Sequence, residues 1–348
     1  MIVAGAAFAN TEQGAVFPKI NLHIAVVTTN SAGMRETAFG SLETCHRVCD
    51  ALSGRYHQVD YCEVSSEEDL RMVVTRKPDL VVLCAKYVID NEQNLKIWLS
   101  DFFLVNGIPY TGSDRVTLEF DSNKSKAKTV LLNNGIATAK YFLTYPDQFR
   151  VEEKLPLPFP LFIKPVDAAN GNGIDENSLV HDFPSYRAKV QEVFNVYGMA
   201  ALVEEVLPGR EFTVAILDGA GTGALSIMPV EIIAPKNTKG DRVLGYREKL
   251  DNQETLHEVT EPILSAVSSL AGAAFAALGV RDFGRIDIKL DAEGVPNFIE
   301  ANLVPGMTPH SSYFPLACAL NRNMTFSDVV LKIADMALKR IKPAEAAV

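Results

Sequence analysis

An alternating stretch near the C-terminal end restricts the fold more than any other part of the chain: GRIDIKLDAEGVPNFIEAN, from Gly284 to Asn302. Asp291 to Gly294 supply turn residues, so we expect a β-hairpin in which Leu290 faces Val295. Side chains alternate between the two faces of a strand. The face turned to the core is therefore expected to carry Ile286, Ile288, Leu290, Val295 and Ile299.

The opposite face of this hairpin is expected to be polar and to carry Arg285, Asp287, Lys289, Glu300 and Asn302. In the expected register Asp287 faces Phe298, and Arg285 faces Glu300. Two carboxylates and an amide oxygen suit a hard cation such as Mg²⁺, held between carboxylates and phosphate. The simpler alternative is a solvated strand face with ordinary cross-strand ion pairs. The hairpin alone leaves both interpretations open.

Upstream of the hairpin, strand-like runs alternate with helical patterns. Leu22 to Thr28, Tyr61 to Val64 and Leu80 to Ala85 are β-rich, and Ser65-Ser66-Glu67-Glu68 has the pattern of a capped helix start. Such alternation predicts an α/β fold with an N-terminal, Rossmann-like parallel sheet. Downstream the mixture is closer to α+β.

Turn-rich and proline-rich segments suggest where the chain divides. We expect a boundary near residue 113, after the segment Asn106 to Ser113. At roughly 150 residues per domain, 348 residues allow two to three domains. The predicted division is 1–113, 114–200 and 201–348.

Composition excludes several classes of protein. The formal net charge of −10 argues against sequence-independent nucleic-acid binding, which needs a basic surface. No apolar run approaches the roughly 20 residues that span a bilayer, so no membrane association is expected. The apolar segment Met1 to Ala9 lacks a basic start, and the five scattered cysteines fit a reducing compartment. A cytoplasmic protein is therefore expected.

Two further segments suggest a nucleotide. Lys164 ends the strand-like run LFIKP and precedes a loop that ends in Gly171-Asn172-Gly173, where a lysine and close backbone N–H groups could hold phosphate. In Leu202 to Leu217, Glu204 and Glu211 flank a Leu-Pro-Gly-Arg bend and could accept from adenine and ribose. The alternatives are a plain turn and two glutamates at exposed strand ends.

Taken together, these blocks resemble the D-alanine–D-alanine ligase branch of the ATP-grasp enzymes. The similarity runs from Tyr110-Thr-Gly-Ser113 through Lys124, FIKP, VEEVLPGREFTVAIL and GRID to IEANLVPGMTPHS, over roughly residues 110 to 316. The resemblance implies a three-domain ATP-grasp architecture: 1–113 would be the N-terminal α/β substrate-binding domain, 114–200 the central ATP-grasp subdomain and 201–348 the C-terminal ATP-grasp and catalytic domain. ATP would lie between the last two. It also implies an ADP-forming ligase that activates a carboxylate as an acyl phosphate and transfers it to an amine.

The resemblance assigns roles to individual residues. It implies that ATP is bound by Lys124, Lys164, Asn170, Gly171, Asn172, Gly173, Glu204, Glu205, Val206, Leu207 and Glu211. Mg²⁺, usually two ions, with Mn²⁺ a possible substitute, would be bound by Asp287, Glu300 and Asn302. Catalysis would use Arg285 at the oxyanion, Lys249 at the γ-phosphate and Ser311 near the acceptor. The implied substrate pocket would include Glu36, Leu250, Gly306, Ser311 and Ser312.

The chain departs from this family where the first substrate would bind. The N-terminal loop and the stretch Ala85 to Glu92 do not match, Asn170 stands where a serine is expected, and Leu250 where a tyrosine is expected. We therefore expect an amide-forming ligase of amino acids in a specialised or natural-product pathway, dimeric by analogy. The alternatives are an authentic D-alanine–D-alanine ligase, an intramolecular cyclo-ligase using the same acyl phosphate, and a non-catalytic nucleotide-binding protein.

Overall fold

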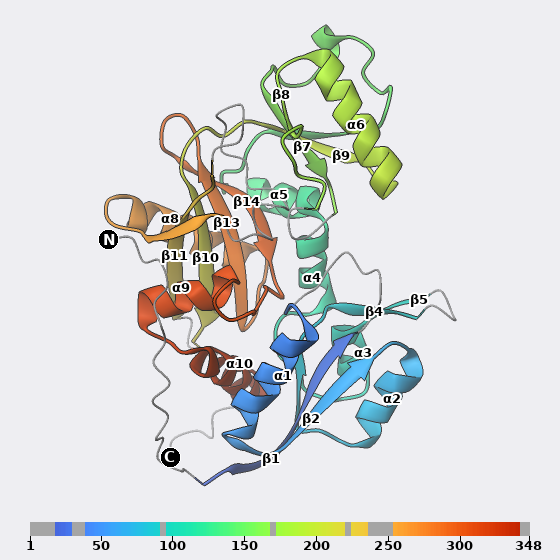
Figure 1. Cartoon of the computed structure of the whole chain (residues 1–348), viewed down its shortest axis with the longest axis vertical. Coiled ribbons are helices and arrows are strands. Elements are labelled where there is room, and N and C mark those ends of the chain that lie inside the picture. Colours follow the sequence, from blue (N-terminus) through green and yellow to red (C-terminus); the bar gives the residue numbers. More distant parts are fainter. Residues whose placement is uncertain are drawn as a thin grey trace.

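The computed structural model describes residues 18–29, 39–90, 95–167, 172–219, 224–235 and 253–341. Four β-sheets organise these residues, and Figure 1 shows the three larger ones stacked along the long axis of the molecule. In the described part of the chain, no helix combines the length and apolar character needed to cross a membrane.

The N-terminal sheet is parallel, as the sequence predicts, with the order β2-β1-β3. Its strands are β1 (Ile20–Thr29), β2 (Tyr56–Val64) and β3 (Leu80–Leu83). Helices cover both faces, because alternate β1 residues are buried on opposite sides. Ile24 and Val26 share a core with α1 (Leu42–Ser53), whereas Ala25 and Val27 share one with α2 (Glu67–Thr75) and α3 (Leu99–Val105). Ser66 and Asp69 form the capping box that starts α2.

A small ribbon and two helices connect this sheet to the rest of the molecule. The ribbon pairs β4 (Tyr87–Asp90) with β5 (Leu95–Trp98), and it is followed by α4 (Arg115–Ser122) and α5 (Lys124–Asn133). Asp114 caps α4 and Asn123 caps α5, each by accepting a backbone N–H from the first turn. These short helices lie against β14 of the C-terminal hairpin, and α5 contributes the lysines.

The central sheet has the order β6-β9-β7-β8. Its members are β6 (Tyr141–Thr144), β7 (Leu161–Pro165), β8 (Leu179–Val180) and β9 (Ala201–Glu205), with the short 3-10 turn Glu152–Lys154 between β6 and β7. Helix α6 (Phe183–Tyr197) covers it through a compact apolar core. Because β9 pairs with β6 and β7, a boundary at residue 200 would separate it from its own sheet. The domain limits remain a prediction, and we move the second to after Glu205.

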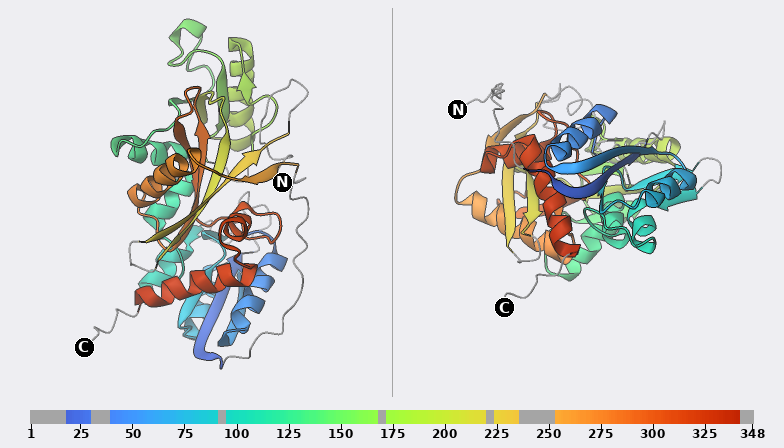
Figure 2. Two further views of the ribbon diagram at one scale, coloured as in Figure 1. Left: turned by 90° about the vertical axis from the view of Figure 1, so that its left-hand side faces the viewer. Right: turned by 90° about the horizontal axis from the view of Figure 1, so that it is seen from below.

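The C-terminal sheet is antiparallel, with the order β12-β11-β10-β13-β14. It contains β10 (Glu211–Asp218), β11 (Leu225–Ile233), β12 (Thr255–Glu258), β13 (Phe283–Leu290) and β14 (Pro296–Asn302). Helices α8 (Ile263–Ala277) and α9 (Tyr313–Arg322) pack against it. Helix α10 (Phe326–Ile341) returns to the N-terminal sheet and packs against α1 and β3, as the side view in Figure 2 shows.

The expected hairpin forms, but its predicted register is wrong. Leu290 pairs with Pro296 and not with Val295, so Ile288 meets Phe298. A bulge at Ile299 then shifts the pairing by one more residue, so that Asp287 pairs with Glu300 and Arg285 with Asn302. The expected core positions Val295 and Ile299 are also wrong. The turn, one residue longer than expected, places Phe298 in the core, and the bulge places Ala301 there, whereas Val295 is 49% exposed and Ile299 is half-buried. A bulge adds one residue to one strand, and counting outward from an assumed turn anticipates neither this nor a longer turn.

Candidate functional site

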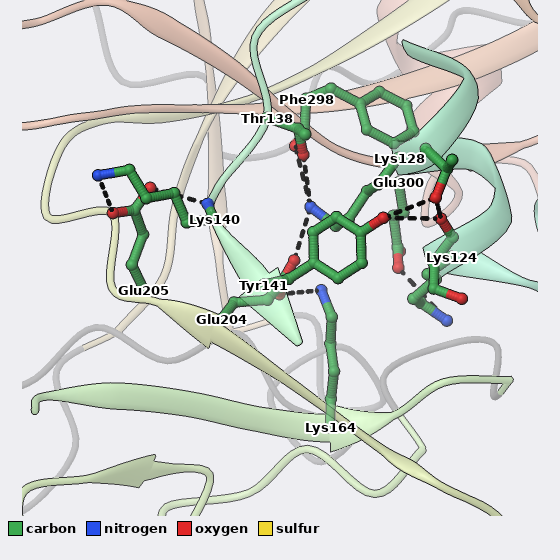
Figure 3. A network of polar contacts seen from close by, with 12 residues as sticks. Lys124, Lys128, Thr138, Lys140, Tyr141, Lys164, Glu204, Glu205, Phe298 and Glu300 are labelled. Carbon is green, nitrogen blue, oxygen red and sulfur yellow. Dashed lines mark hydrogen bonds and ion pairs between the residues drawn. The ribbon is translucent and has the colours of Figure 1, made fainter. Parts of the chain in front are cut away.

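Two lysines of α5 lie on the buried side of that helix. Lys124 and Lys128 are one helical turn apart and point the same way, with side chains 5% and 0% exposed. Lys126, between them, faces solvent and pairs with Glu119 at 2.7 Å. Figure 3 shows both buried lysines turned toward residues of β9 and β14. The helix therefore brings two cations to a place where two sheets meet.

Glu204 on β9 is the centre of this network. Its Oε1 lies 2.6 Å from the Lys128 ammonium and its Oε2 2.7 Å from that of Lys164 on β7. Burial alone would raise the pKa of Glu204, but the two lysines hold it below its ordinary value. Burial likewise opposes charge on Lys164, yet the nearby carboxylates, Glu204 first, raise its pKa. At Lys128 burial is the larger effect and lowers the pKa, although Glu204 opposes it. The ion pairs therefore favour the charged forms of Glu204 and Lys164 in particular.

The network continues from Lys128 to the hairpin of β13 and β14. The Lys128 ammonium donates to the Thr138 hydroxyl at 2.6 Å and to the Phe298 carbonyl at 3.4 Å. Thr138 itself donates to the same carbonyl at 2.8 Å. Lys124 Nζ lies 3.7 Å from Glu300 Oε2, two residues further along β14. Three lysines thus face two glutamates, which leaves a net positive site suited to phosphate (Figure 3).

On the polar face of the hairpin, Asp287 and Arg285 form one unit. Arg285 Nε and Nη2 donate to the two Asp287 oxygens at 3.0 and 2.9 Å, and Thr213 donates to Oδ1 at 2.6 Å. Asn302 Nδ2 donates to Asp287 Oδ2 at 3.1 Å. Burial alone would lower the pKa of Arg285, and the Asp287 and Glu300 carboxylates raise it. Asp287 therefore holds the Arg285 guanidinium in place, and this contact uses only some of the guanidinium N–H donors.

The same face fits a magnesium ion. Asp287 and Glu300 are directly paired across β13 and β14, and Asn302 lies on the same face two residues beyond Glu300. Two carboxylates and an amide on one strand face are the hard oxygen donors that Mg²⁺ takes. In the described residues, no cluster of three or more His, Cys, Asp or Glu side chains offers an alternative site.

The bend that follows β9 packs on the hairpin, and its role in binding adenine remains a prediction. Leu207 is buried, Val206 is half-buried, and the Gly209 N–H donates to the Leu290 carbonyl at 3.0 Å. A Cβ on Gly209 would lie 2.6 Å from the Leu290 side chain, so the bend lies directly on the hairpin. Glu205 Oε1 accepts the Lys140 N–H at 2.8 Å, which holds β9 to the start of β6.

Two of the predicted nucleotide ligands are already paired with lysines. Glu211 Oε2 accepts from Lys289 Nζ at 2.9 Å, and both Glu204 oxygens are ion-paired. The assignments of Glu211 to ribose and Glu204 to adenine remain predictions. In the glycine loop, Gly173 has φ +78°, and a Cβ there would lie 2.5 Å from Pro165. Only glycine fits this position, next to Lys164 and the half-buried Asn172.

The loop before α9 contains the predicted acceptor residues. Ser312 Oγ accepts the Thr308 N–H at 3.0 Å, and a Cβ on Gly306 would lie 2.8 Å from the same oxygen. Ser312 therefore shapes its own loop, and Ser311, beside it, is half-buried. Other predicted residues lie outside the described part of the chain: Glu36, Asn170, Gly171, Lys249 and Leu250.

Three contacts near the site were not anticipated from the sequence. Lys128 belongs to none of the motifs of the sequence, although its spacing from Lys124 places both on one face of α5. Lys86 Nζ lies 3.0 Å from Asp121 Oδ1, both buried. The Tyr313 hydroxyl donates to Glu254, from a segment far away in the sequence. No local pattern signals the last two contacts.

Comparison with known proteins agrees with this geometry. The family model described as "D-ala D-ala ligase C-terminus" matches residues 130–335. A D-alanine–D-alanine ligase from Methylacidiphilum infernorum is 29% identical over 93% of this chain and 98% of its own length. Another, from Bordetella petrii, is 31% identical over 68% of this chain and 70% of its own length.

Solved structures show the same fold. A D-alanine–D-alanine ligase from Bacillus anthracis, crystallised with ATP, has a TM-score of 0.71 at 19% identity, covering 92% of this chain and 98% of its own. A D-Ala:D-Ser ligase from Enterococcus faecalis has a TM-score of 0.66 at 20% identity, covering 91% and 100%. These likenesses confirm the expected α/β, ATP-grasp type of fold.

Proposed function

This chain belongs to the D-alanine–D-alanine ligase family, an ADP-forming group of C–N ligases, and we propose that it joins the carboxylate of one amino acid to the amino group of another. One observation carries the proposal. Three lysines and Glu204 lie at the junction of the central and C-terminal sheets, and the Asp287, Glu300 and Asn302 set lies on the hairpin beside them. Phosphate and metal can therefore bind side by side.

The residues present can perform each part of this reaction. A carboxylate is a poor electrophile, so it must first be activated by the γ-phosphoryl group of ATP. Lys124 and Lys164 would bind the phosphates, and Asp287, Glu300 and Asn302 would hold Mg²⁺, which neutralises charge on the transferring phosphoryl group. Arg285, held in place by Asp287, has further N–H donors for the oxyanion that forms when the amine attacks. No protein nucleophile is needed.

D-alanine is the first candidate for both substrates, because the similar ligases named above bear its name. The second candidate is another amino acid of a specialised pathway. Leu250 and Asn170 favour it, because neither offers the hydroxyl that the family has at its position, and a site lacking such polar groups loses selectivity for a small polar substrate. Ring closure within one substrate would use the same acyl phosphate. We further propose two metal ions, a homodimer and a cytoplasmic location.

Product analysis tests the proposal. Purified protein with ATP, Mg²⁺ and a panel of amino acids, D-alanine included, should release ADP and phosphate in step with a dipeptide detected by mass. The acyl phosphate route transfers only the γ-phosphoryl group. Stoichiometric AMP and pyrophosphate would refute the mechanism. ATP binding without turnover on the whole panel would instead favour a nucleotide-binding protein that has lost catalysis.

A further inference from the structure

A tyrosine and a glutamate outside the predicted site extend from Arg285. The Arg285 guanidinium carbon lies 5.4 Å from the centroid of the Tyr313 ring, close enough for a cation–π contact. Tyr313 is only 7% exposed, and its hydroxyl donates to Glu254 Oε1. Burial, with Glu254 beside it, raises the pKa of Tyr313, so the phenol stays protonated and remains a donor. The three side chains form a continuous chain that starts at the proposed oxyanion site.

The second oxygen of this glutamate is unmatched within the described residues. Glu254 Oε2 is a buried atom and accepts no hydrogen bond from the part of the chain that the structure describes. Buried carboxylate oxygens are normally paired, because water or a donor must replace the lost hydration. An unmatched acceptor held in place by Tyr313 therefore points to a donor that arrives with a ligand.

The order of the sheet indicates which ligand group this is. The phosphate lysines and Glu300 lie at the β14 edge, whereas Glu254 immediately precedes β12, at the other edge. Arg285 on β13 and Tyr313 at the start of α9 lie between these two groups. If phosphate occupies the lysine side of the acyl carbon, the opposite side is left for the incoming amine. That is the side of Tyr313 and Glu254.

We propose that Glu254 Oε2 binds the amino group of the acceptor amino acid, which makes Glu254 and Tyr313 the acceptor-amine subsite. This inference rests on the proposed function. An amino acid arrives as an ammonium ion and must lose one proton before it attacks. That proton can pass to Glu254: the N–H bond breaks, an O–H bond forms on Oε2, and the freed nitrogen pair forms the C–N bond. As the C–O bond to phosphate breaks, the nitrogen gives up a second proton, which leaves with the phosphate as HPO₄²⁻, and the amide is neutral.

Glu254→Gln tests the inference against a matched control, Glu258→Gln, at an exposed glutamate of β12. Each variant receives ATP, Mg²⁺ and the best donor amino acid, with either an amino acid or hydroxylamine as the acceptor. Hydroxylamine is uncharged near neutral pH and needs no carboxylate partner. For Glu254→Gln, the ratio of dipeptide to hydroxamate should fall by ~30-fold or more, with a raised acceptor KM, as expected for loss of a charged hydrogen bond. Glu258→Gln should keep the wild-type ratio.

Tyr313→Phe provides a second variant, because it keeps the ring over Arg285 and removes only the hydroxyl. It should lower the same ratio by several-fold, since Glu254 would be less firmly held. An equal fall of dipeptide and hydroxamate in both variants would overturn the inference. It would mean that the Tyr313–Glu254 contact only holds α9 to the segment before β12. Failure of the wild type to form either product would refute the proposed function itself.

Discussion

At the residue scale, the charges of the site depend on one another. Glu204 is 3% exposed and is charged only because two lysines flank it. Breaking a buried pair costs far more than forming an exposed one, because the remaining charge is left without water or partner. Single substitutions here should therefore separate structural from catalytic roles. Substitution of Glu204 should mainly lower the stability of the fold, and substitution of Glu300, at the edge of the network, should mainly lower turnover.

Glu300→Gln removes one charge from the proposed Mg²⁺ site and keeps the size of the side chain. We expect kcat to fall by ~100-fold or more, equivalent to about 3 kcal/mol of transition-state stabilisation. The free energy of unfolding should change by no more than about 1 kcal/mol, because the Glu300 side chain is 18% exposed and its Lys124 contact is long, at 3.7 Å. Glu293→Gln, in the exposed turn of the same hairpin, should change neither kcat nor the free energy of unfolding. Normal turnover with early melting would make this hairpin face structural.

The depressed pKa of Glu204 predicts a pH dependence of stability. A carboxylate whose folded-state pKa lies below its unfolded value stabilises the fold above the unfolded pKa. This contribution should be complete above about pH 4.5 and should be lost as the pH falls through the lower, folded-state pKa. Urea unfolding of wild type and Glu204→Gln over a pH series isolates it. The difference between the two should shrink on acidification, and a constant difference would contradict the assignment.

At the scale of elements, α5 joins two sheets that are otherwise in separate layers. Its buried lysines contact β9 through Glu204 and β14 through Phe298 and Glu300. The helix can do this because Lys124 and Lys128 are one turn apart, and because Asn123 fixes where the first turn begins. The site is therefore assembled by a helix that belongs to neither sheet.

Lys128→Met tests this role of α5. Loss of the ammonium leaves Glu204 with one partner instead of two and removes a donor to Thr138 and Phe298. We expect a loss of about 3 kcal/mol in unfolding free energy and a raised KM for ATP. Lys126→Met, on the exposed side of the same helix, should cost less than about 1 kcal/mol. Equal losses of unfolding free energy for the two substitutions would show that the buried position of Lys128 on α5 does not matter for stability.

At the scale of the whole molecule, ion pairs connect the N-terminal sheet and α10 to the hairpin of β13 and β14. Lys86 follows β3 and pairs with Asp121 of α4, whose Oδ2 accepts the Leu303 N–H at 2.7 Å, one residue after Asn302. Arg340 of α10 similarly bonds Asp282, before β13, and the Tyr110 carbonyl. The position of a proposed metal ligand thus depends on residues more than 200 positions away in the sequence.

Lys86→Met should leave Asp121 as a buried, unpaired charge and cost about 3 kcal/mol or more in unfolding free energy. Asp121→Asn removes that charge and keeps an oxygen for the Leu303 N–H, so the double variant should be more stable than Lys86→Met alone. Chemical denaturation of the wild type, the two single variants and the double variant completes a double-mutant cycle. Additive losses in the double variant would show that the two side chains are not coupled.

The sequence by itself determined the local and periodic features of this protein. Period-two alternation placed Asp287, Glu300 and Asn302 on one face of a hairpin, and strand–helix alternation predicted the parallel N-terminal sheet, because both signals lie within a few neighbouring residues. Motif resemblance predicted the family. The bulge at Ile299, the ion pairs of Glu204 and the Arg285–Tyr313–Glu254 chain were decided only by the tertiary structure. Each depends on packing between segments far apart in the chain, where one extra residue or one buried partner changes which groups meet.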